Sequence, residues 1–154
     1  MIVASRLARP AYAAFDGVGG LYRAGRWHSL GQRVIYVSES EALAALEILV
    51  HLSSITQIPE YVCVKAHIPE ALVLDVQDLG GLPSDWRAAE PVEARALGTR
   101  WIIEKQSAAL RVPSVVIPRE RNYLLNPEHF DFHQIRMEGP LPFEFDVRLG
   151  TRLH

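Results

Sequence analysis

An acidic side chain interrupts the most apolar segment of the chain. The segment ALAALEILVHL, residues 42–52, is apolar almost all the way round a helix, and Glu47 is its one carboxylate. At helical spacing Glu47 shares a face with Leu43, Leu46 and Val50, and we expect that face to be buried. Burying a carboxylate is costly unless it is paired, hydrogen-bonded or protonated. Such conflicts concentrate at functional sites, so Glu47 is either a functional carboxylate or a structural one held by an arginine or a backbone group.

Arginines supply a second kind of chemistry. Residues 1–38 carry five arginines against the single acid Asp16, whereas the rest of the chain is net negative. A guanidinium is a rigid, permanently charged fork that suits phosphates and carboxylates. Aromatic residues interleave with these arginines and can stack on a base. The segment therefore favours a phosphorylated ligand, and the alternative is solvated surface charge with ordinary aromatic packing.

Composition excludes several classes of protein. The chain has 154 residues, 49% hydrophobic and 22% charged, which is ordinary for one globular domain spanning residues 1–154. No apolar run reaches the roughly 18 residues of a membrane helix, and no signal-peptide core is present, so we expect a cytoplasmic protein without a membrane partner. The lone Cys63 excludes an internal disulfide and a thiolate-rich zinc site.

Other motifs carry less chemistry. His129 and His133 flank Asp131 in a loop-like segment that offers no further ligand, so we expect no metal site. The glycines of GVGG, residues 17–20, lack the GK[ST] of a phosphate loop, and no G-x-S-x-G elbow is present.

Both helices and strands must position these residues. Ser38 followed by Glu41 is a capping-box pattern and predicts a helix over about 39–52, and a second helix is expected over about 91–110. Strands are predicted at 33–37, 61–68, 71–76 and 112–117, with further extended segments at 122–126, 134–137 and 143–149. The prolines around 112–117 place that strand near an edge or a bulge. Strands outnumber helices without clean βαβ alternation, which predicts an α+β fold.

Six fragments in order resemble a known family. They are Arg6, GVGGLYRAGRW (17–27), VIYVSESEALAALEILVHL (34–52), LGTRW (97–101), VPSVVIP (112–118) and NYLLNP (122–127). This order resembles the RES domain, the toxin half of RES–Xre toxin–antitoxin modules, and it covers residues from about 6 to 130. The resemblance implies a single domain similar to the ADP-ribosyltransferase fold, with mixed or antiparallel sheets and a buried helix after the second motif.

The resemblance also implies a site. The catalytic set that it implies is Arg26, Tyr36, Glu47 and Ser114. The expected nucleotide-contacting set is Arg6, Arg26, Trp27, His28, Tyr36 and Asn122. Many relatives carry asparagine where this chain has His28, which leaves the role of that position open.

The implied activity is degradation of NAD+ by cleavage of its nicotinamide–ribose bond, with water or inorganic phosphate as acceptor. No metal and no cofactor beyond NAD+ as substrate is expected. Glu47 would stabilise an oxocarbenium-like ribose, and Arg26 with Arg6 would bind the diphosphate. Tyr36 would stack on nicotinamide, and Ser114 would donate a hydrogen bond to ribose or carboxamide. The expected partner is an Xre-like antitoxin that blocks the pocket and forms an oligomer with the toxin.

Two alternatives remain at this point. The same pocket can transfer ADP-ribose to a cellular protein, which would make the chain a mono-ADP-ribosyltransferase. The second alternative, which is not an enzyme, is a non-catalytic module that binds a nucleotide or a nucleic acid through the basic, aromatic opening segment. A strongly salt-dependent affinity for polynucleotide would identify it. The sequence does not distinguish NAD+ from NADP+.

Overall fold

All strands of the described chain belong to one sheet. The structure is a computed structural model that describes residues 1–52 and 58–152; residues 53–57 and 153–154 of the predicted domain lie outside the described residues. The sheet order is β4-β5-β6-β2-β1-β3-β7, and every neighbouring pair is antiparallel except β4 with β5. The strands are β1 Ile2–Ala8, β2 Ile35–Ser38, β3 Tyr61–Ile68, β4 Val73–Asp75, β5 Ala109–Pro113, β6 Arg121–Leu125 and β7 Arg136–Phe143.

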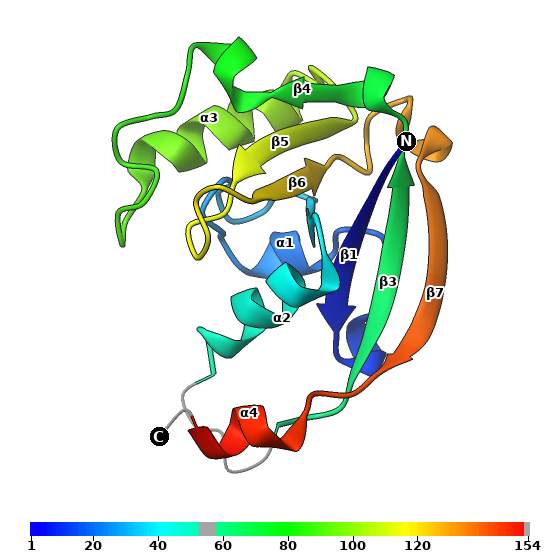
Figure 1. Ribbon diagram of the computed structural model, residues 1–154. Coiled ribbons are helices and arrows are strands. Elements are labelled where there is room, and N and C mark those ends of the chain that lie inside the picture. Colours follow the sequence, from blue (N-terminus) through cyan, green and yellow to red (C-terminus); the bar gives the residue numbers. More distant parts are fainter. Residues whose placement is uncertain (53–57, 153–154) are drawn as a thin grey trace.

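The sheet divides into two groups of strands that run in different directions (Figure 1). One group holds β1, β3 and β7, and the other holds β4, β5 and β6. Between them, β1 pairs with β2 at Ser5 opposite Ser38. Where the two groups diverge, one sheet face is free to carry a pocket.

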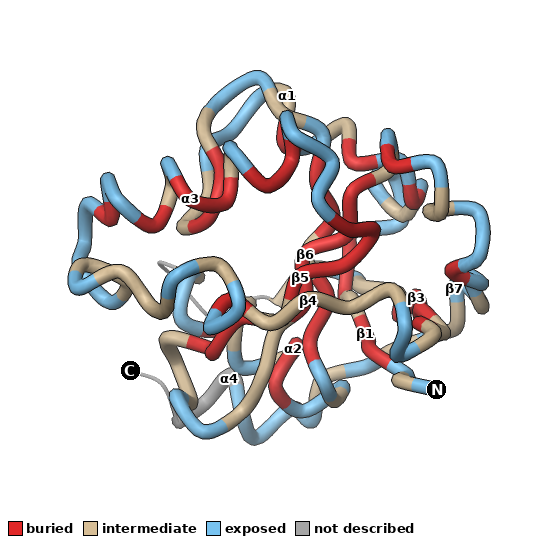
Figure 2. Tube along the Cα trace, turned by 90° about the horizontal axis from the view of Figure 1, so that it is seen from above, coloured by how far each residue is buried: buried red, intermediate tan, exposed pale blue. Residues whose placement is uncertain are grey.

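In the part of the chain that the structure describes, four helices accompany the sheet: α1 Gly19–Tyr22, α2 Glu41–Leu49, α3 Val92–Ile103 and α4 Val147–Arg152. Short 3-10 turns lie at Pro10–Tyr12, Glu70–Leu72, Val76–Leu79 and Phe132–Gln134. Helix α3 packs through Leu97 and Trp101 against Leu110 and Leu124 of β5 and β6. Buried residues accordingly concentrate along the central strands and on the inner side of α3 (Figure 2). Among the described residues no helix is long and apolar enough to cross a bilayer.

The free part of this sheet face lies between α3 and α2. Side chains of directly paired residues point to the same face, and alternate residues of one strand share it. Tyr36 pairs with Leu124, and Ser38 pairs with Asn122. Since α3 covers Leu124, the polar residues Tyr36, Ser38 and Asn122 continue the same face beyond the helix.

Two helix boundaries differ from the sequence predictions. Helix α2 is capped by Ser40, whose hydroxyl accepts a hydrogen bond from the Leu43 amide at 3.1 Å, so the predicted cap at Ser38 is wrong. Helix α3 ends at Ile103 instead of about 110. It ends in a Schellman motif, in which the amides of Lys105 and Gln106 donate to the carbonyls of Ile102 and Trp101. Lys105 adopts the left-handed φ of 50° that usually marks a glycine, so no sequence signal announced this end.

Several extended segments also differ. The strand predicted at 112–117 is β5, which ends at Pro113 and lies between β4 and β6 instead of at an edge. Of the segment 71–76, residues 73–75 form a strand and the flanks are 3-10 turns. The segment predicted as extended at 143–149 contains the start of α4, because Asp146 accepts a hydrogen bond from the Arg148 amide and caps that helix. The α+β class is confirmed.

Candidate active site

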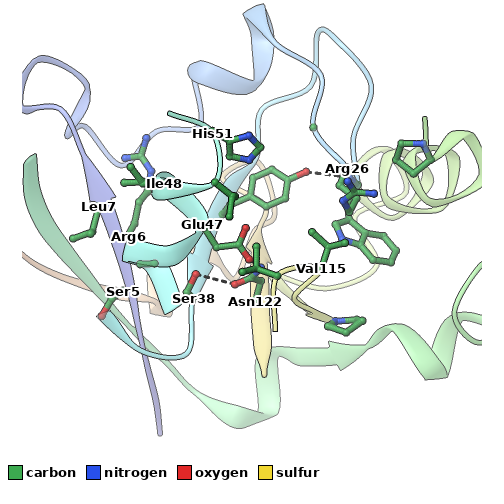
Figure 3. A pocket seen from close by; sticks show the side chains of 18 of the residues that line it. Ser5, Arg6, Leu7, Arg26, Ser38, Glu47, Ile48, His51, Val115 and Asn122 are labelled. Atoms are coloured by element: carbon green, nitrogen blue, oxygen red, sulfur yellow. Dashed lines mark hydrogen bonds between the residues drawn. The ribbon is translucent and has the colours of Figure 1, made fainter. Parts of the chain in front are cut away.

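A pocket of about 650 Å3 opens over the free part of the sheet face. Its floor is formed by Tyr36, Ser38 and Asn122, and its sides come from α2 and from the segment 24–27. Arg6 and Arg26 lie on opposite sides of Glu47 in Figure 3. The volume is within the usual range for small-molecule sites.

Glu47 lies in this pocket on the exposed side of α2. Leu43 is buried as expected, but Leu46 is 40% exposed and Val50 is 58% exposed, so the predicted buried stripe is wrong. The pocket occupies the space where a packing partner would otherwise cover this side of the helix. The carboxylate is therefore half-buried, shielded by the pocket and still accessible from it.

Neutral donors fix one oxygen of Glu47. Ser114 Oγ donates to Glu47 Oε1 at 2.7 Å, and Asn122 Nδ2 donates to the same oxygen at 2.9 Å. Ser38 Oγ in turn donates to Asn122 Oδ1 at 2.8 Å, as the dashed line in Figure 3 shows. We call Glu47, Ser114, Asn122 and Ser38 the acidic wall. No described residue donates to Glu47 Oε2, which is left to meet a ligand.

Ser114 acts on Glu47 and not on the pocket space. It is 0% exposed, and its hydroxyl accepts hydrogen bonds from the amides of Val116 and Ile117, each at 3.1 Å. These bonds turn the chain directly after β5, which is why the strand ends there. Since its one proton goes to Glu47, Ser114 does not make the expected donation to ribose or carboxamide, and its place in the site is to orient the carboxylate.

The opposite side of the pocket is built around two arginines. Arg26 Nη1 donates to the carbonyls of Trp86 at 3.0 Å and Ala88 at 2.7 Å. Arg95 Nε donates to the Gly25 carbonyl at 2.8 Å, and its Nη1 lies 3.3 Å from a carboxylate oxygen of Glu90. We call Arg26 and Arg95, with the segments 23–29 and 85–90 that they join, the arginine wall.

Close packing against α3 holds the arginine wall in place. Trp27 is buried in the core beneath α3, and a Cβ on Gly98 would overlap the Trp27 carbonyl far inside van der Waals contact. The Ser29 amide also donates to Thr99 Oγ1 at 2.9 Å. Trp27 reaches the pocket lining, but most of it serves as packing.

Tyr36 and His28 are joined behind the pocket floor. The Tyr36 hydroxyl lies 2.7 Å from His28 Nδ1 and accepts a hydrogen bond from the Trp27 amide at 3.2 Å. His28 Nε2 lies 2.7 Å from the Arg23 carbonyl. Burial raises the pKa of Tyr36, and burial also lowers the pKa of His28, so both groups favour their neutral forms.

Arg6 completes the charged lining from β1. Its Nη1 donates to the Tyr12 carbonyl at 3.2 Å, and burial lowers its pKa, against the opposing effect of Asp16. Three arginines therefore face the pocket, with Glu47 as the one carboxylate among its described lining residues. This charge balance suits a ligand with about two negative charges.

Comparisons with known proteins identify the family of this chain. The sequence profile of the RES domain matches residues 3–146.

The chain belongs to the RES domain family.

A protein named Toxin Res from Photorhabdus laumondii is 38% identical to this RES domain over 148 residues, or 94% of each chain. Toxin Res from Yersinia enterocolitica is 35% identical over 141 residues, covering 89% of this chain and 91% of that protein. A protein named Prs ADP-ribosylating toxin from a Sphingobium species is 34% identical over 144 residues, covering 90% of this chain and 89% of that protein.

A chain in the crystal structure of the M. tuberculosis MbcT–MbcA toxin–antitoxin complex shares the fold of this RES domain. The TM-score is 0.74 at 16% identity, and the match covers 98% of this chain and 87% of that one. The family prediction is confirmed, as is the α+β fold of the ADP-ribosyltransferase type.

The RES-domain positions identified by resemblance come together to different degrees. Arg6, Arg26, Tyr36, Glu47 and Asn122 all reach the pocket, whereas Ser114 and His28 stand behind residues that do. Sequence reasoning missed Ser38, Arg95 and His51, which also line the pocket. Ser38 could have been found from its two-residue spacing from Tyr36 in one strand, which places both side chains on the same face. No local sequence pattern marked Arg95 or His51.

Proposed function

We propose that this RES domain is the toxin of a toxin–antitoxin pair and that it cleaves the nicotinamide–ribose bond of NAD+. The observation that carries the proposal is the orientation of Glu47, with one oxygen fixed by Ser114 and Asn122 and the other left for a ligand. A preoriented carboxylate stabilises positive charge as it develops, at no cost of reorganisation during the reaction.

The proposed chemistry balances without a metal. The bond between ribose C1′ and the nicotinamide nitrogen breaks, and its electron pair neutralises the cationic ring. The ribose becomes oxocarbenium-like, as in glycoside cleavage, and Glu47 Oε2 stabilises that charge. Water or inorganic phosphate then bonds to C1′ and releases its proton to solvent. Arg26, Arg95 and Arg6 supply donors for the diphosphate from the rest of the lining.

Transfer of ADP-ribose to a protein is the second candidate. It is favoured by the 34% identity to the Sphingobium protein named as an ADP-ribosylating toxin. The same pocket and carboxylate serve both reactions, because they differ only in the group that bonds to C1′. We propose NAD+ degradation first, because an open pocket admits small acceptors without any further surface.

The proposed partner is an antitoxin. The shared fold with a toxin in the MbcT–MbcA complex and the identity to proteins named Toxin Res support it. We propose an Xre-like antitoxin that covers the pocket and assembles with this chain into an oligomer in the cytoplasm. Covering the pocket would place Glu47 out of reach of NAD+.

A mass-spectrometric time course of NAD+ with the purified protein tests the function. Samples run with and without phosphate, and Glu47→Gln serves as the control because glutamine keeps an acceptor for Ser114 and Asn122 but lacks the charge. We expect free nicotinamide, and at least about a hundredfold slower release with Glu47→Gln. ADP-ribose indicates hydrolysis, and a phosphorylated ADP-ribose that requires phosphate indicates phosphorolysis. ADP-ribose found attached to protein instead supports the second candidate, and no loss of NAD+ overturns the proposal of NAD+ degradation.

A further inference from the structure

We infer that His51 is a further catalytic residue, the base that takes a proton from the water that attacks C1′ of the ribose. The inference rests on the proposed function, because it concerns the reaction in which water accepts the ADP-ribosyl group. Three features of His51 support it: the direction in which it faces, its distance from Glu47, and the absence of any hydrogen bond from another described residue to its ring.

The first feature is the direction in which His51 faces. The residues of α2 and the following turn that line the pocket are the exposed Val50 and residues 44, 47, 48, 51 and 52. Apart from Val50, their spacing of i, i+3, i+4, i+7 and i+8 is that of one helix face. The amides of Val50 and His51 donate to the carbonyls of Leu46 and Ile48, which extends the helical turn past the end of α2. His51 therefore faces the same pocket as Glu47 (Figure 3).

The second feature is the distance between His51 and Glu47. Residues four apart on a helix have Cβ atoms about 6 Å apart. In glycoside cleavage, a carboxylate that activates a water lies about 6.5–9.5 Å from its partner group, because the sugar carbon and the water must both fit between them. One helical turn together with two flexible side chains gives that separation. Glu47 and His51 can therefore enclose C1′ and one water.

The third feature is that His51 is a base with no other task. No described residue forms a hydrogen bond with its imidazole, and the side chain is exposed at the pocket. Glu47 has one oxygen bound to Ser114 and Asn122, and it needs its charge for the ribose. The rest of the described lining offers arginines, which keep their protons, and hydroxyl, amide, indole and apolar groups, which are not bases.

The reaction balances with His51 as the proton acceptor. The water oxygen bonds to C1′, and the nicotinamide nitrogen leaves with the electron pair of the broken bond. One proton of the water moves to a ring nitrogen of His51, and because the ring is exposed the proton passes on to solvent. The hydrogen phosphate dianion instead attacks through an oxygen that carries no proton. Phosphorolysis therefore does not need this base.

Comparing hydrolysis with phosphorolysis tests the inference. By mass spectrometry we would measure kcat for ADP-ribose in phosphate-free buffer and for phosphorylated ADP-ribose with phosphate present. Hydrolysis should fall about a hundredfold in both His51→Ala and His51→Gln, because glutamine is polar but not a base, whereas phosphorolysis should change little. Leu46→Ala is the matched control, since Leu46 is exposed on the same helix and does not line the pocket, and it should behave as the wild type.

Added imidazole gives a second readout that a structural role would not move. It can enter the open pocket of His51→Ala and should restore part of the rate of ADP-ribose formation, while the wild type and Leu46→Ala stay unchanged. Measuring ADP-ribose itself excludes any ADP-ribosyl transfer to imidazole from the count. Equal thermal melts of all variants show that each one is folded.

The outcomes separate the inference from the function. Hydrolysis that survives His51→Ala, or that imidazole does not restore, overturns the inference while the function stands. Equal falls in hydrolysis and phosphorolysis also overturn it, because His51 would then act on folding or binding. A wild type that cleaves NAD+ only with phosphate has no water step and overturns it as well, and for a wild type that only hydrolyses, the imidazole result decides. If the wild type releases no nicotinamide in either buffer, the proposed function itself has failed.

Discussion

The acidic wall and the arginine wall of the pocket are held in opposite ways. Glu47 is held by neutral side chains, Ser114 and Asn122, that lie 67 and 75 residues away along the chain. The arginines instead donate to backbone carbonyls of the segments beside them. The negative charge of Glu47 is therefore oriented but not neutralised, whereas part of each guanidinium is committed to shaping its own wall.

This difference assigns different tasks to the two walls. A carboxylate held by neutral donors retains its full field for a developing cation. Arg26 is bonded to neutral carbonyls and so keeps its charge for an anionic ligand while it fixes the loops, whereas Arg95 also pairs with the exposed Glu90. Substitutions in the acidic wall should consequently lower kcat, and substitutions in the arginine wall should lower stability or weaken binding of the ligand.

The largest expected effect is on the support of the arginine wall. Gly98→Ala places a methyl group against the Trp27 carbonyl, which is backbone and must move. We expect a loss of about 3 kcal/mol of stability, or roughly 6–12 °C in Tm, together with loss of activity. Thermal melts by circular dichroism measure it. Gly19→Ala is the matched control, since a Cβ there meets nothing within 4 Å, and equal melts for the two variants would contradict the packing argument.

The next effect concerns the acidic wall. Ser114→Ala removes a donor to Glu47 and leaves the amides of Val116 and Ile117 without their acceptor. We expect kcat for NAD+ cleavage to fall about 10–100-fold with little change in KM, because orientation of the carboxylate is lost and not the binding groups. Steady-state kinetics check this. Ser38→Ala, whose link to Glu47 runs through Asn122, should lower kcat less, and for Ser114→Ala a rise in KM alone would assign Ser114 to binding instead.

A smaller effect is expected for Arg26→Lys. Lysine keeps the charge but lacks the planar fork that bonds two carbonyls and faces the pocket at once. We expect KM for NAD+ to rise about tenfold with a smaller change in kcat. The exposed Arg23 offers a control in the same segment, and Arg23→Lys should leave KM unchanged. If kcat fell and KM stayed constant, Arg26 would act on the chemical step.

The smallest effect is the pH dependence that His28 adds to stability. Burial lowers its pKa in the folded state, so the unfolded state binds more protons below about pH 6.5 and stability falls as pH decreases through that window. The positive charge of Arg95 also lowers the pKa of His28, and the group that His28 contacts on β2, Tyr36, is neutral. Between pH 7.5 and 5.5 we expect a loss of stability that His28→Asn lacks. Denaturant unfolding of both proteins measures the difference, and parallel pH profiles would show that His28 is not the titrating group.

The sequence by itself determined the fold class and the family, and it singled out Glu47, which lies in the pocket. Glu47 stood out because a carboxylate in an apolar helix conflicts with local pattern, and that conflict can be read without a structure. Arg26, Tyr36 and Asn122 followed from the order of motifs, and all of them reach the pocket. Strand and helix periodicity are local properties, which is why β2, β3 and β6 lie close to their predicted bounds, whereas β1 was not predicted.

Only the tertiary structure decided which side chains form hydrogen bonds with one another. The capping-box pattern favoured Ser38 over Ser40, but the pairing of β2 with β6 commits Ser38 to Asn122 and Ser40 caps the helix. Ser114 was expected to contact the ligand, but the turn after β5 buries it behind Glu47. The contact of His28 with Tyr36 depends on the Arg23 carbonyl and on the space that Gly25 leaves. These are hydrogen bonds set by strand register and loop packing, and such long-range geometry has no local signal in the chain.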